Sequence, residues 1–386
     1  MITNSTTKGT DMEYYTAIGI DVSDKTSKIC VMTKSGGKRR IVLERTVETT
    51  KEGFRSFLGT LERSWPVTFE TGVHCRWMHD EIGAMGFKVF VANPAKLRQL
   101  TESNTTNDTN DARELARFTL ADVELLHPVF IRPEPYQQML RLLKARDLML
   151  GIRTKLINEM RGFAKSMGFR LPKTDAGRFH KLDRSSWPTE FETLAFPMID
   201  VLETLAVKIK ANESQMRELA GTETFANPVA RCREVYGVGF FTAAAFVALL
   251  GGNVERFAKA KDIGPYLGLV PKQDQSGEID KQCSITKAGC EFMRSMLTEC
   301  AQVAMKDSAA PSDLKLKAWR ICASGGPKSR KRAVSAVARG LAVTMLALLK
   351  HPEREYKALS DDKRIEWEAA FGPIPEPGER IRIKRA

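Results

Sequence analysis

Tyr15-Thr16-Ala17-Ile18-Gly19-Ile20-Asp21 (YTAIGID) is an apolar run that ends on an acid. Such a run is typical of a buried β-strand. Two more strand-like runs follow at residues 28–32 and 41–47, and Ser35-Gly36-Gly37 supplies the turn between them. Glycine-containing turns between apolar runs are a hairpin signal. The start of the chain therefore predicts a three-stranded meander.

Alternating helical and strand patterns continue beyond the meander. Residues 51–62 have helical periodicity, residues 67–70 form a short β run that ends on Glu70, and residues 75–85 are helical again. Residues 88–92 (KVFVA) form a fifth strand before Asn93-Pro94 interrupts the chain. Three strands, helix, strand, helix, strand and helix is the element order of the ribonuclease H fold. We therefore expect a chain of the α/β plus α class with a ribonuclease H-like N-terminal domain.

The middle of the chain has the pattern of two long helices. Residues 136–167 carry apolar side chains at three- and four-residue steps, which predicts a long amphipathic helix of the coiled-coil type. A second long helix is expected at residues 191–219, with Pro197 ending or kinking its first turns. The polar segment 170–189 between them reads as a loop insertion. Two such helices predict an antiparallel stalk, which suits dimerisation as well as it suits domain spacing.

The last third of the chain is expected to be mostly helical. Gly237-Val238-Gly239 precedes the apolar, Ala-rich residues 242–250, which matches a helix-hairpin-helix turn. These patterns divide the chain into five predicted segments. They are a mobile N-terminus (1–13), the α/β domain (14–133), the helical stalk with its insertion (134–226), the C-terminal domain (227–352) and a charged C-terminal tail (353–386).

Composition narrows the class of partner. The 386 residues carry a formal net charge of +13, with 42% hydrophobic and 28% charged residues, so the chain is globular and basic. A basic surface gains affinity by displacing counterions from phosphates, which favours nucleic acid as the partner over a membrane. The apolar runs at 240–250 and 341–349 are too short to span a bilayer, and residues 1–11 do not resemble a signal peptide. We expect an intracellular, cytoplasmic protein.

The seven cysteines are scattered, odd in number and form no C-x-x-C pair. This pattern predicts reduced thiols in a cytosolic protein, and neither a zinc site nor a disulfide framework.

Four acids stand at the ends of the predicted elements. Asp21 ends the first strand, Glu70 ends the fourth, and Asp108 and Asp111 lie three residues apart at the start of a helix, which places them on one face. The first and fourth strands are neighbours in a ribonuclease H sheet, so these carboxylates can reach one point. Hard oxygen donors suit Mg²⁺, and one or two such ions stabilise the attacking and leaving oxygens in phosphoryl transfer.

Each acid also has a structural explanation. Asp21 could cap the turn before Ser23, Glu70 could be a surface acid, and Asp111-x-x-Glu114 fits a helical capping box. The four acids together, in that element order and in a basic chain, favour metal binding.

Candidate nucleic-acid contacts lie in the second half of the chain. The backbone N–H groups of the Gly237 to Gly239 turn suit a phosphate at a helix start, although a tight helix-helix turn explains the same glycines. Four cations stand at the start of another apolar helix, where positive charge is unfavourable to the helix dipole. Contact with an RNA or DNA backbone explains their presence there; a solvated face is the alternative. The four cations are Lys328, Arg330, Lys331 and Arg332. Arg141, Lys144, Arg146, Arg153 and Lys155 give the first long helix a basic side.

Several segments resemble the DEDD transposases of bacterial insertion sequences, the insertion sequence one-ten family. The N-terminal matches are residues 18–23 (IGIDVS), 69–72 (FETG) and 106–116 (TNDTNDARELA). The C-terminal matches are residues 237–239 (GVG), 266–271 (YLGLVP) with Phe257, 275–277 (QSG) and 285–289 (ITKAG). One departure is the Thr106-Asn107 entry to the third acid, where the family commonly has Lys-Thr; the acid itself is present.

This resemblance implies a RuvC-like N-terminal domain, a coiled-coil middle and a C-terminal transposase domain. It implies a recombinase guided by a structured bridge RNA that pairs with donor and target DNA, in a homo-oligomer, a dimer or tetramer, that is associated with the bacterial nucleoid. The family's acids correspond to Asp21, Glu70, Asp108 and Asp111, which would bind Mg²⁺, and its nucleophilic serine corresponds to Ser276.

Ser276 lies in the polar segment 272–278, which by composition alone is a surface loop. A serine hydroxyl needs activation by a base or a metal, and no histidine stands near it in the sequence. Ser284 is the next candidate if Ser276 is not the nucleophile. The mechanism that fits is attack by Ser276 on a phosphate held at the Mg²⁺ site, which leaves a covalent phosphoserine link that conserves the bond energy. The resemblance implies that the acids and the serine come from different subunits.

Three rival functions share parts of this pattern. An actin-like or sugar-kinase ATPase also opens with an IGID-type strand, but it needs a Gly/Thr-rich phosphate turn where this chain has Val22-Ser23-Asp24-Lys25. A RuvC-like, Mg²⁺-dependent, structure-specific nuclease would use the same acids and attack with water. A non-catalytic nucleic-acid-binding scaffold would need no such acids.

Overall fold

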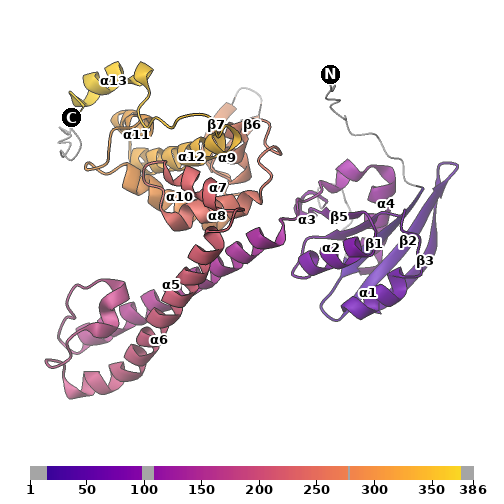
Figure 1. The fold of residues 1–386 in the computed structure, drawn as a ribbon, viewed down its shortest axis with the longest axis horizontal. Coiled ribbons are helices and arrows are strands. Elements are labelled where there is room, and N and C mark those ends of the chain that lie inside the picture. The colour runs from indigo at the N-terminus through magenta and orange to yellow at the C-terminus, as the bar shows by residue number, and fades with distance from the viewer. Residues whose placement is uncertain (1–14, 98–107, 277–278, 375–386) are drawn as a thin grey trace. The chain divides into compact units, whose positions relative to one another are not determined.

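The structure is a computed structural model that describes residues 15–97, 108–276 and 279–374. It divides into an N-terminal unit that extends to Ile131 and a C-terminal unit that begins at Arg132 (Figure 1). The first unit is mixed α/β, and the second is mostly helical with one two-stranded sheet; a mixed N-terminal domain and a mostly helical C-terminal region are what the sequence predicts.

The N-terminal unit contains a five-stranded sheet in the order β3-β2-β1-β4-β5. Its strands are β1 (Thr16–Val22), β2 (Thr26–Ser35), β3 (Lys38–Glu48), β4 (Val67–Glu70) and β5 (Val89–Ala92). β1, β2 and β3 are antiparallel, whereas β1, β4 and β5 are parallel. Gly36 and Gly37 have φ values of 55° and 78° and join β2 to β3 in two residues, as a type I′ turn requires. The predicted three-stranded meander and the predicted order of strands and helices along the chain up to β5 are confirmed.

Helices cover both faces of this sheet. One face packs on α1 (Lys51–Leu58) and α2 (Cys75–Ala84) through Ile18, Ile20 and the buried Phe54 and Met78. The other face packs on α4 (Asp108–Ala121). α3 (Pro94–Leu97) and the short η1 (Val123–Leu126) complete the unit. The expected helix 51–62 ends at Leu58 instead, because the Arg63 guanidinium donates to the Leu58 carbonyl at 2.6 Å and satisfies that end.

α5 (Glu134–Ser166) and α6 (Thr189–Ala220) form a helical hairpin. Its two helices are antiparallel, because Leu143 shares a core cluster with Met216, and Met160 shares another with Phe191. α6 is continuous through Pro197, so the proline does not end the helix, which was one of its two expected effects. A proline forfeits one backbone hydrogen bond, and Ala195, Ile199 and Leu202 keep that stretch buried against α5.

The connection between α5 and α6 is not the polar loop that its composition predicts. It contains the short helix η2 (Ala176–Lys181), and Phe179 is fully buried. Trp187 and Phe169 make edge contacts with Phe191, with ring centroids 5.1 and 4.9 Å apart. A few aromatic residues in a polar sequence thus build a small core at this end of the hairpin.

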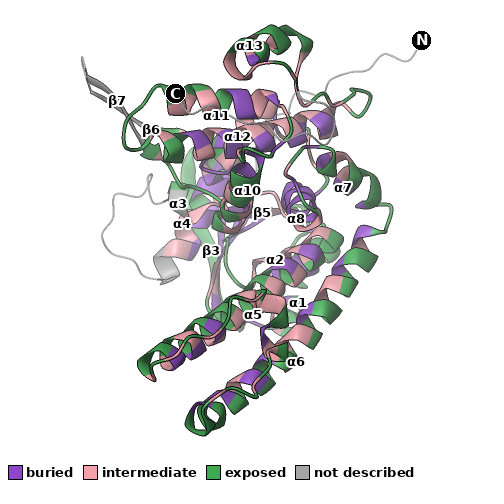
Figure 2. Cartoon of the chain, turned by 90° about the vertical axis from the view of Figure 1, so that its left-hand side faces the viewer, coloured by how far each residue is buried: buried purple, intermediate pink, exposed green. Residues whose placement is uncertain are grey.

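The remaining elements pack around two apolar helices. They are α7 (Ala226–Arg233), α8 (Phe240–Leu250), η3 (Ala260–Asp262), α9 (Ile263–Tyr266), β6 (Pro271–Ser276), β7 (Ile279–Ile285), α10 (Glu291–Ala304), α11 (Asp313–Ala323), α12 (Ser329–Lys350) and α13 (Asp361–Phe371). α8 is buried along most of its length, as Figure 2 shows. Of the helices in the described ranges, α12 alone is long and apolar enough to cross a membrane by length and composition, and Val337, Leu341 and Met345 on it are fully buried in this core.

α13 lies in the segment that the charge pattern predicts to be a tail. Trp367 is fully buried, and its ring centroid lies 4.4 Å from that of Phe371, which in turn contacts Trp319. Most of residues 361–368 are charged, and Trp367 is the buried residue of this helix. The charged neighbours make the sequence look like a solvated tail, although Trp367 packs in the core. Residues 361–371 therefore belong to the C-terminal unit; residues 375–386 lie outside the described ranges.

Candidate active site

β1 and α4 meet backbone to backbone at Gly19. A Cβ atom at this position would lie 2.1 Å from the Ala112 carbonyl oxygen and 2.6 Å from the Ala116 nitrogen, so only glycine fits. On the neighbouring strand, the Thr68 hydroxyl lies 2.8 Å from the Thr119 hydroxyl of α4. Gly19 and Thr68 are paired in register, so these two contacts fix α4 across β1 and β4.

Asp21 and Glu70 follow Gly19 and Thr68 by two residues each. Side chains two apart on a strand share a face, so both acids belong to the face that α4 covers. Parallel pairing of Ile20 with Phe69 makes Asp21 and Glu70 the next neighbours, at the carboxyl ends of β1 and β4. Asp21 is half-buried and Glu70 is exposed. The sequence prediction that the first and fourth strands are adjacent is therefore confirmed.

Asp108 and Asp111 both lie in the first turn of α4. Asp111 is half-buried beside Ala112, the residue that contacts Gly19, so it lies near the same end of β1. The side chain of Asp108 is outside the described part of the structure. The capping-box explanation of Asp111 is wrong, because the helix has already begun three residues earlier.

Carboxylate oxygens are the donors that a hard divalent cation prefers, so the chemistry of this donor set fits such an ion. Within the described ranges, no three His, Cys, Asp or Glu side chains are already close enough together to hold a metal. The backbone places the acids at one edge of the sheet. For their carboxylates to hold one ion together, the side chains would have to rotate towards one another and Asp108 would have to take part.

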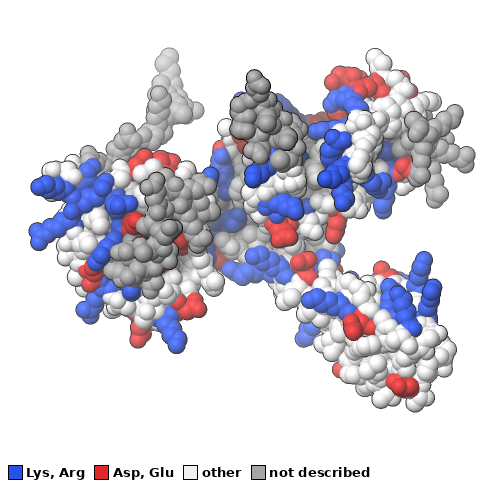
Figure 3. Space-filling view, turned by 180° about the vertical axis from the view of Figure 1, so that it is seen from behind, with Lys and Arg blue, Asp and Glu red and all other residues white. Residues whose placement is uncertain are grey.

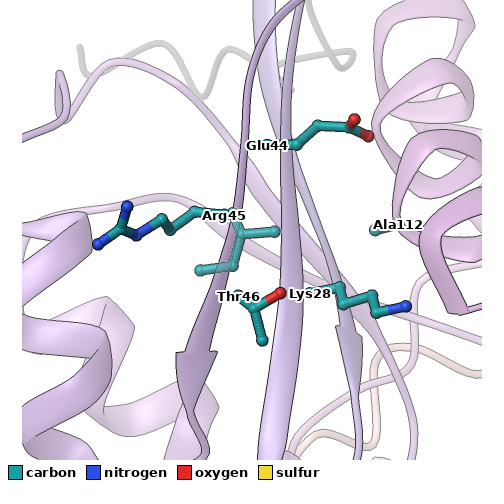
Figure 4. A pocket seen from close by; sticks show the side chains of 6 residues that line it. Lys28, Glu44, Arg45, Thr46 and Ala112 are labelled. Carbon is teal, nitrogen blue, oxygen red and sulfur yellow. The ribbon is translucent and has the colours of Figure 1, made fainter.

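A basic residue stands beside these acids. Lys28 on β2 is the register partner of Asp21, and it lines a hollow of about 320 Å³ together with Glu44, Thr46 and Ala112. Figure 4 shows Lys28 and Glu44 extending towards α4, whereas Arg45 extends to the opposite side. Glu44 accepts two hydrogen bonds from Arg113, at 2.6 and 2.8 Å, and this guanidinium lowers the pKa of the Glu44 carboxyl.

The loops that follow the two acid-bearing strands are tied together by a residue that the sequence reading missed. His74 lies 3.2 Å from the Asp24 carboxylate through Nε2, and its Nδ1 accepts a hydrogen bond from the Trp77 indole at 3.1 Å. An indole only donates, so Nε2 carries the ring proton and donates it to Asp24. The available signal was positional, since Asp24 and His74 follow Asp21 and Glu70 by three and four residues.

Ser276 is the last residue of β6, and not part of a loop as its composition predicts. β6 and β7 form an antiparallel hairpin in which Ser276 pairs with Ile279. The segment was misread because PKQDQS lacks β-branched and aromatic residues. A Gly-x pair between two runs, here Gly277-Glu278, is a two-residue hairpin signal that could have revealed it. The Ser276 side chain is outside the described part, and Ser284 lies exposed in β7.

One guanidinium adds to the backbone hydrogen bonds at the base of this hairpin, where Thr286 N–H donates to the Val270 carbonyl at 2.9 Å. Arg294 on α10 donates through Nη1 to the carbonyls of Leu267, Ala288 and Gly289, at 3.2, 2.9 and 3.0 Å. Gly268, with φ of 66°, permits the close approach of these segments, since a Cβ there would lie 2.1 Å from the Ala288 carbonyl oxygen. Arg294 is thus a positioning residue for the strand that ends on Ser276.

The glycine turn before α8 has a structural role. Gly237 has φ of 87°, a conformation that favours glycine, and a Cβ there would lie 3.1 Å from the Cys300 carbonyl oxygen of α10. Gly239 has an extended conformation and begins α8 without a side-chain cap. The expected turn between two helices, α7 and α8, is present, and the packing of Gly237 accounts for the first glycine.

The cations predicted to contact nucleic acid differ in their surroundings. Lys328, Arg330, Lys331 and Arg332 are exposed around the start of α12, as expected. Arg146 does not belong to a solvated basic side: it pairs with Glu213 at 2.6 Å and stacks 3.8 Å from the Phe241 ring centroid. Arg146 therefore joins α5, α6 and α8. Figure 3 shows other Lys and Arg side chains spread over the surface of both units, with acidic groups between them.

Comparison with known proteins assigns this arrangement to a class. A model of DEDD transposases of the IS110 type matches residues 18–168, which contain Asp21, Glu70, Asp108 and Asp111. A second model, the transposase IS116/IS110/IS902 family, matches residues 229–315, which contain Ser276 and Arg294. The chain is a DNA transposase.

Individual relatives agree with both family models. The transposase for insertion sequence element IS1111A from Coxiella burnetii is 25% identical over 302 residues, 77% of this chain and 80% of the relative. The transposase for insertion sequence element IS1328 from Yersinia enterocolitica is 26% identical over 303 residues, 76% of this chain and 85% of the relative. The chain belongs to the IS110 family of insertion-sequence transposases, and DEDD enzymes of this kind use a divalent cation.

Proposed function

We propose that this transposase cuts and rejoins donor and target DNA through a phosphoserine intermediate, with Asp21, Glu70, Asp108 and Asp111 binding Mg²⁺ and Ser276 as the nucleophile. The observation that carries the proposal is the edge where β1 and β4 end and α4 begins. Two carboxylates on adjacent parallel strands and two in the first helical turn supply four oxygen-donor groups there. The strand order around them, β3-β2-β1-β4-β5, supports a ribonuclease H-like, RuvC-like domain.

The proposed chemistry exchanges one phosphodiester for another. The Ser276 hydroxyl oxygen forms a bond to the scissile phosphorus, the bond from phosphorus to one deoxyribose oxygen breaks, and the serine proton is passed to that leaving oxygen. A hydroxyl of the partner strand then attacks the phosphoserine and restores the serine. When bound, a divalent cation supplies charge neutralisation at the phosphate oxygens. No external energy source is needed, because each step conserves the phosphoester bond.

The acids and the serine lie in different units of the chain. We propose that the complete site forms in a homo-oligomer, a dimer or tetramer, in which one subunit supplies the acids and another supplies Ser276. Exposed apolar side chains on the α5–α6 hairpin support association through this coiled-coil-like element. They are Leu148, Ile152, Leu194, Phe196, Val201 and Val207.

We further propose that a structured bridge RNA selects the DNA sites in the bacterial cytoplasm. A net charge of +13 and the exposed cations around the start of α12 support RNA and DNA backbone contacts. Backbone N–H groups at Gly239 add a site for a phosphate. Sequencing of the RNA that copurifies with the protein tests this part: one structured RNA species is expected, and a random population contradicts guidance.

Substitution of the acids tests the metal-site proposal. Asp21→Ala and Glu70→Ala are expected to reduce strand cleavage by roughly a hundredfold or more, since oriented charge at a phosphate is among the largest catalytic effects. Nucleic-acid binding should change little. Glu52→Ala, an exposed acid on α1, is the matched control. Full cleavage by the Asp21 variant would remove these acids from the mechanism.

Ser276→Ala tests the nucleophile separately. The covalent protein–DNA species on a denaturing gel is expected to disappear, while Ser284→Ala retains it. A RuvC-like nuclease that attacks with water would instead cleave normally without Ser276 and never form the covalent species. That outcome would keep the metal site and reject the phosphoserine intermediate.

A further inference from the structure

A basic cavity lies on the C-terminal unit. None of the residues that line it belongs to the hairpin that carries Ser276. The cavity has a volume of about 860 Å³ and lies between one face of α11, one face of α12 and the segment 354–358. Leu314, Val343, Ala347 and Leu348 line it with apolar surface. A volume of this size is typical of small-molecule sites and admits a nucleotide or two, but no duplex.

The charge of this cavity is strongly one-sided. Seven basic and two acidic residues line it. Three of the cations are neutralised locally: Lys363 pairs with Asp313, Lys357 with Asp361, and Arg320 with Glu366. In the described ranges the other four have no acidic partner; they are Lys261, Lys317, Arg339 and Arg354.

Lys317 lies near enough to other cations of the cavity for their charges to affect it. The pKa of Lys317 is lowered by burial and then by the charges of Arg339 and Lys363. Neighbouring like charges oppose ionisation, and an anion placed among them removes that opposition.

The Arg339 side chain packs against Gly264, in space that the side chain of any other residue at position 264 would fill. A Cβ atom at Gly264 of α9 would lie 2.8 Å from Arg339 Nε and 3.4 Å from its Cδ. The guanidinium therefore lies across the α9 backbone. A side chain so confined loses little further conformational entropy when it binds a ligand.

The cavity also continues an exposed basic surface. Arg332 precedes Arg339 by seven residues, or two turns, so both share one face of α12 about 10 Å apart. Arg332 belongs to the cluster of exposed cations around the start of the helix.

We propose that this cavity binds a single-stranded segment of nucleic acid, with backbone phosphates on Lys317, Arg339 and Arg354 and an unstacked base against the apolar wall of α12. A nucleic acid fits better than an acidic peptide, because the chain is a transposase and because an apolar wall beside cations suits a base joined to a phosphate. RNA and DNA share this chemistry, and the test below separates them. The proposal concerns binding alone and does not depend on the phosphoserine intermediate.

The test uses full-length protein and the double variant Lys317→Ala/Arg339→Ala. Fluorescence anisotropy measures its affinity for labelled single-stranded DNA, single-stranded RNA and duplex DNA over a series of salt concentrations. The single-strand affinity is expected to fall roughly tenfold, and the slope of log K against log salt to fall by about 0.7 for each lost phosphate contact. Duplex binding should fall much less.

Two controls keep the result interpretable. Lys208→Ala/Lys210→Ala removes the same charge from exposed positions on α6 and should leave binding near the wild-type value. Lys317→Arg/Arg339→Lys keeps the charge in the cavity and should retain most of the single-strand affinity, even if the Ala variant is less stable.

Each outcome bears on the proposal. A loss on RNA alone assigns the cavity to RNA, a loss on DNA alone assigns it to DNA, and an equal loss indicates recognition of the shared backbone. Equal losses in the cavity and α6 variants would overturn the proposal, because net charge alone would explain them. Unchanged single-strand binding by the Ala variant would also overturn it, as would displacement of bound strand by poly-glutamate at equal phosphate and carboxylate concentrations. None of these results affects the cleavage test on Asp21.

Discussion

Gly19 connects the packing of the N-terminal unit to its candidate metal edge. Its Cα approaches the backbone of α4 at Ala112 and Ala116, and Asp21 lies two residues further along the same face of β1. A larger residue at Gly19 would therefore displace α4 and with it Asp111.

Gly19→Ala is expected to destabilise the unit by about 3 kcal/mol, because the new methyl would overlap a backbone carbonyl that cannot rotate away. Cleavage should fall even in molecules that remain folded. Chemical denaturation and the cleavage assay measure the two effects. The matched control is Gly83→Ala on the exposed face of α2, where a Cβ meets nothing within 4 Å; it should be neutral or stabilising by up to about 1 kcal/mol. Equal stability of the two variants would contradict the contact.

Lys315 is a buried cation at the seat of α13. Its Nζ donates to the carbonyls of Asp307 and Ala309, at 3.0 and 2.7 Å, and lies 5.9 Å from the centroid of the Trp367 ring. Burial lowers the pKa of Lys315 from 10.5 to about 8. Between these two values the unfolded chain keeps the proton and the folded chain has lost it, so stability contributed by this group rises with pH.

The free energy of unfolding of the wild type, relative to Lys315→Met, should therefore increase between pH 8 and 10.5. An increase of roughly 2 kcal/mol over this range is expected, within the limit of about 1.4 kcal/mol per pH unit. Denaturant titrations at several pH values measure it. Lys306→Met, at an exposed position on the same connection, should follow the wild-type pH dependence. Parallel curves for wild type and Lys315→Met would refute the assignment.

At the scale of elements, the β6–β7 hairpin depends on contacts at its base. Only two strands pair there, and isolated two-stranded hairpins are marginally stable in water. The three carbonyls that Arg294 contacts belong to the segments that enter and leave the hairpin.

Arg294→Ala should leave these carbonyls without their shared donor and loosen the hairpin relative to α10. Amide hydrogen exchange in residues 271–285 is expected to become faster, and the covalent protein–DNA species that we propose for Ser276 is expected to decrease. Glu299→Ala, at an exposed position of the same helix, should change neither. Unaltered exchange in the Arg294 variant would show that the hydrogen bonds between β6 and β7 hold the hairpin without Arg294.

The elements differ in how much of them the sequence foretells. The strand order around Asp21 could be predicted, because buried strands are continuous apolar runs and β4 matches its expected bounds at Val67 and Glu70. The strand β6, which ends on Ser276, could not be predicted. Its residues are polar, and what makes it a strand is its pairing with β7, which the pattern of apolar residues does not indicate. The contact between the Arg146 guanidinium and the Phe241 ring could not be predicted either, because these residues are far apart in the chain.

At the scale of the whole molecule, the two units have separate cores. Ile18, Phe54 and Phe69 belong to the first, whereas Phe246 and Leu341 belong to the second. Separate cores predict separate cooperative unfolding transitions, since cooperativity follows shared packing.

Two transitions are expected in scanning calorimetry, and single substitutions should identify them. Gly19→Ala should lower only one, and Trp367→Ala should lower only the other. Loss of a buried tryptophan costs about 3–5 kcal/mol, which corresponds to a shift of roughly 10 °C in a unit of this size. Ile365→Ala, where the side chain is 79% exposed, is the control for α13. One transition that both substitutions lower would show that the units unfold together.

The contact between Gly19 and α4 also has an evolutionary consequence. The spacing between the strand acids and the helix acids is set by the backbone contact at Gly19 together with the Thr68–Thr119 hydroxyl contact. The apolar core residues can therefore be exchanged without moving the carboxylates, provided that position 19 has no side chain, positions 112 and 116 stay small and positions 68 and 119 keep their hydroxyls. We therefore expect transposases that differ from this one at about three quarters of their aligned positions to be able to keep the same arrangement of acids.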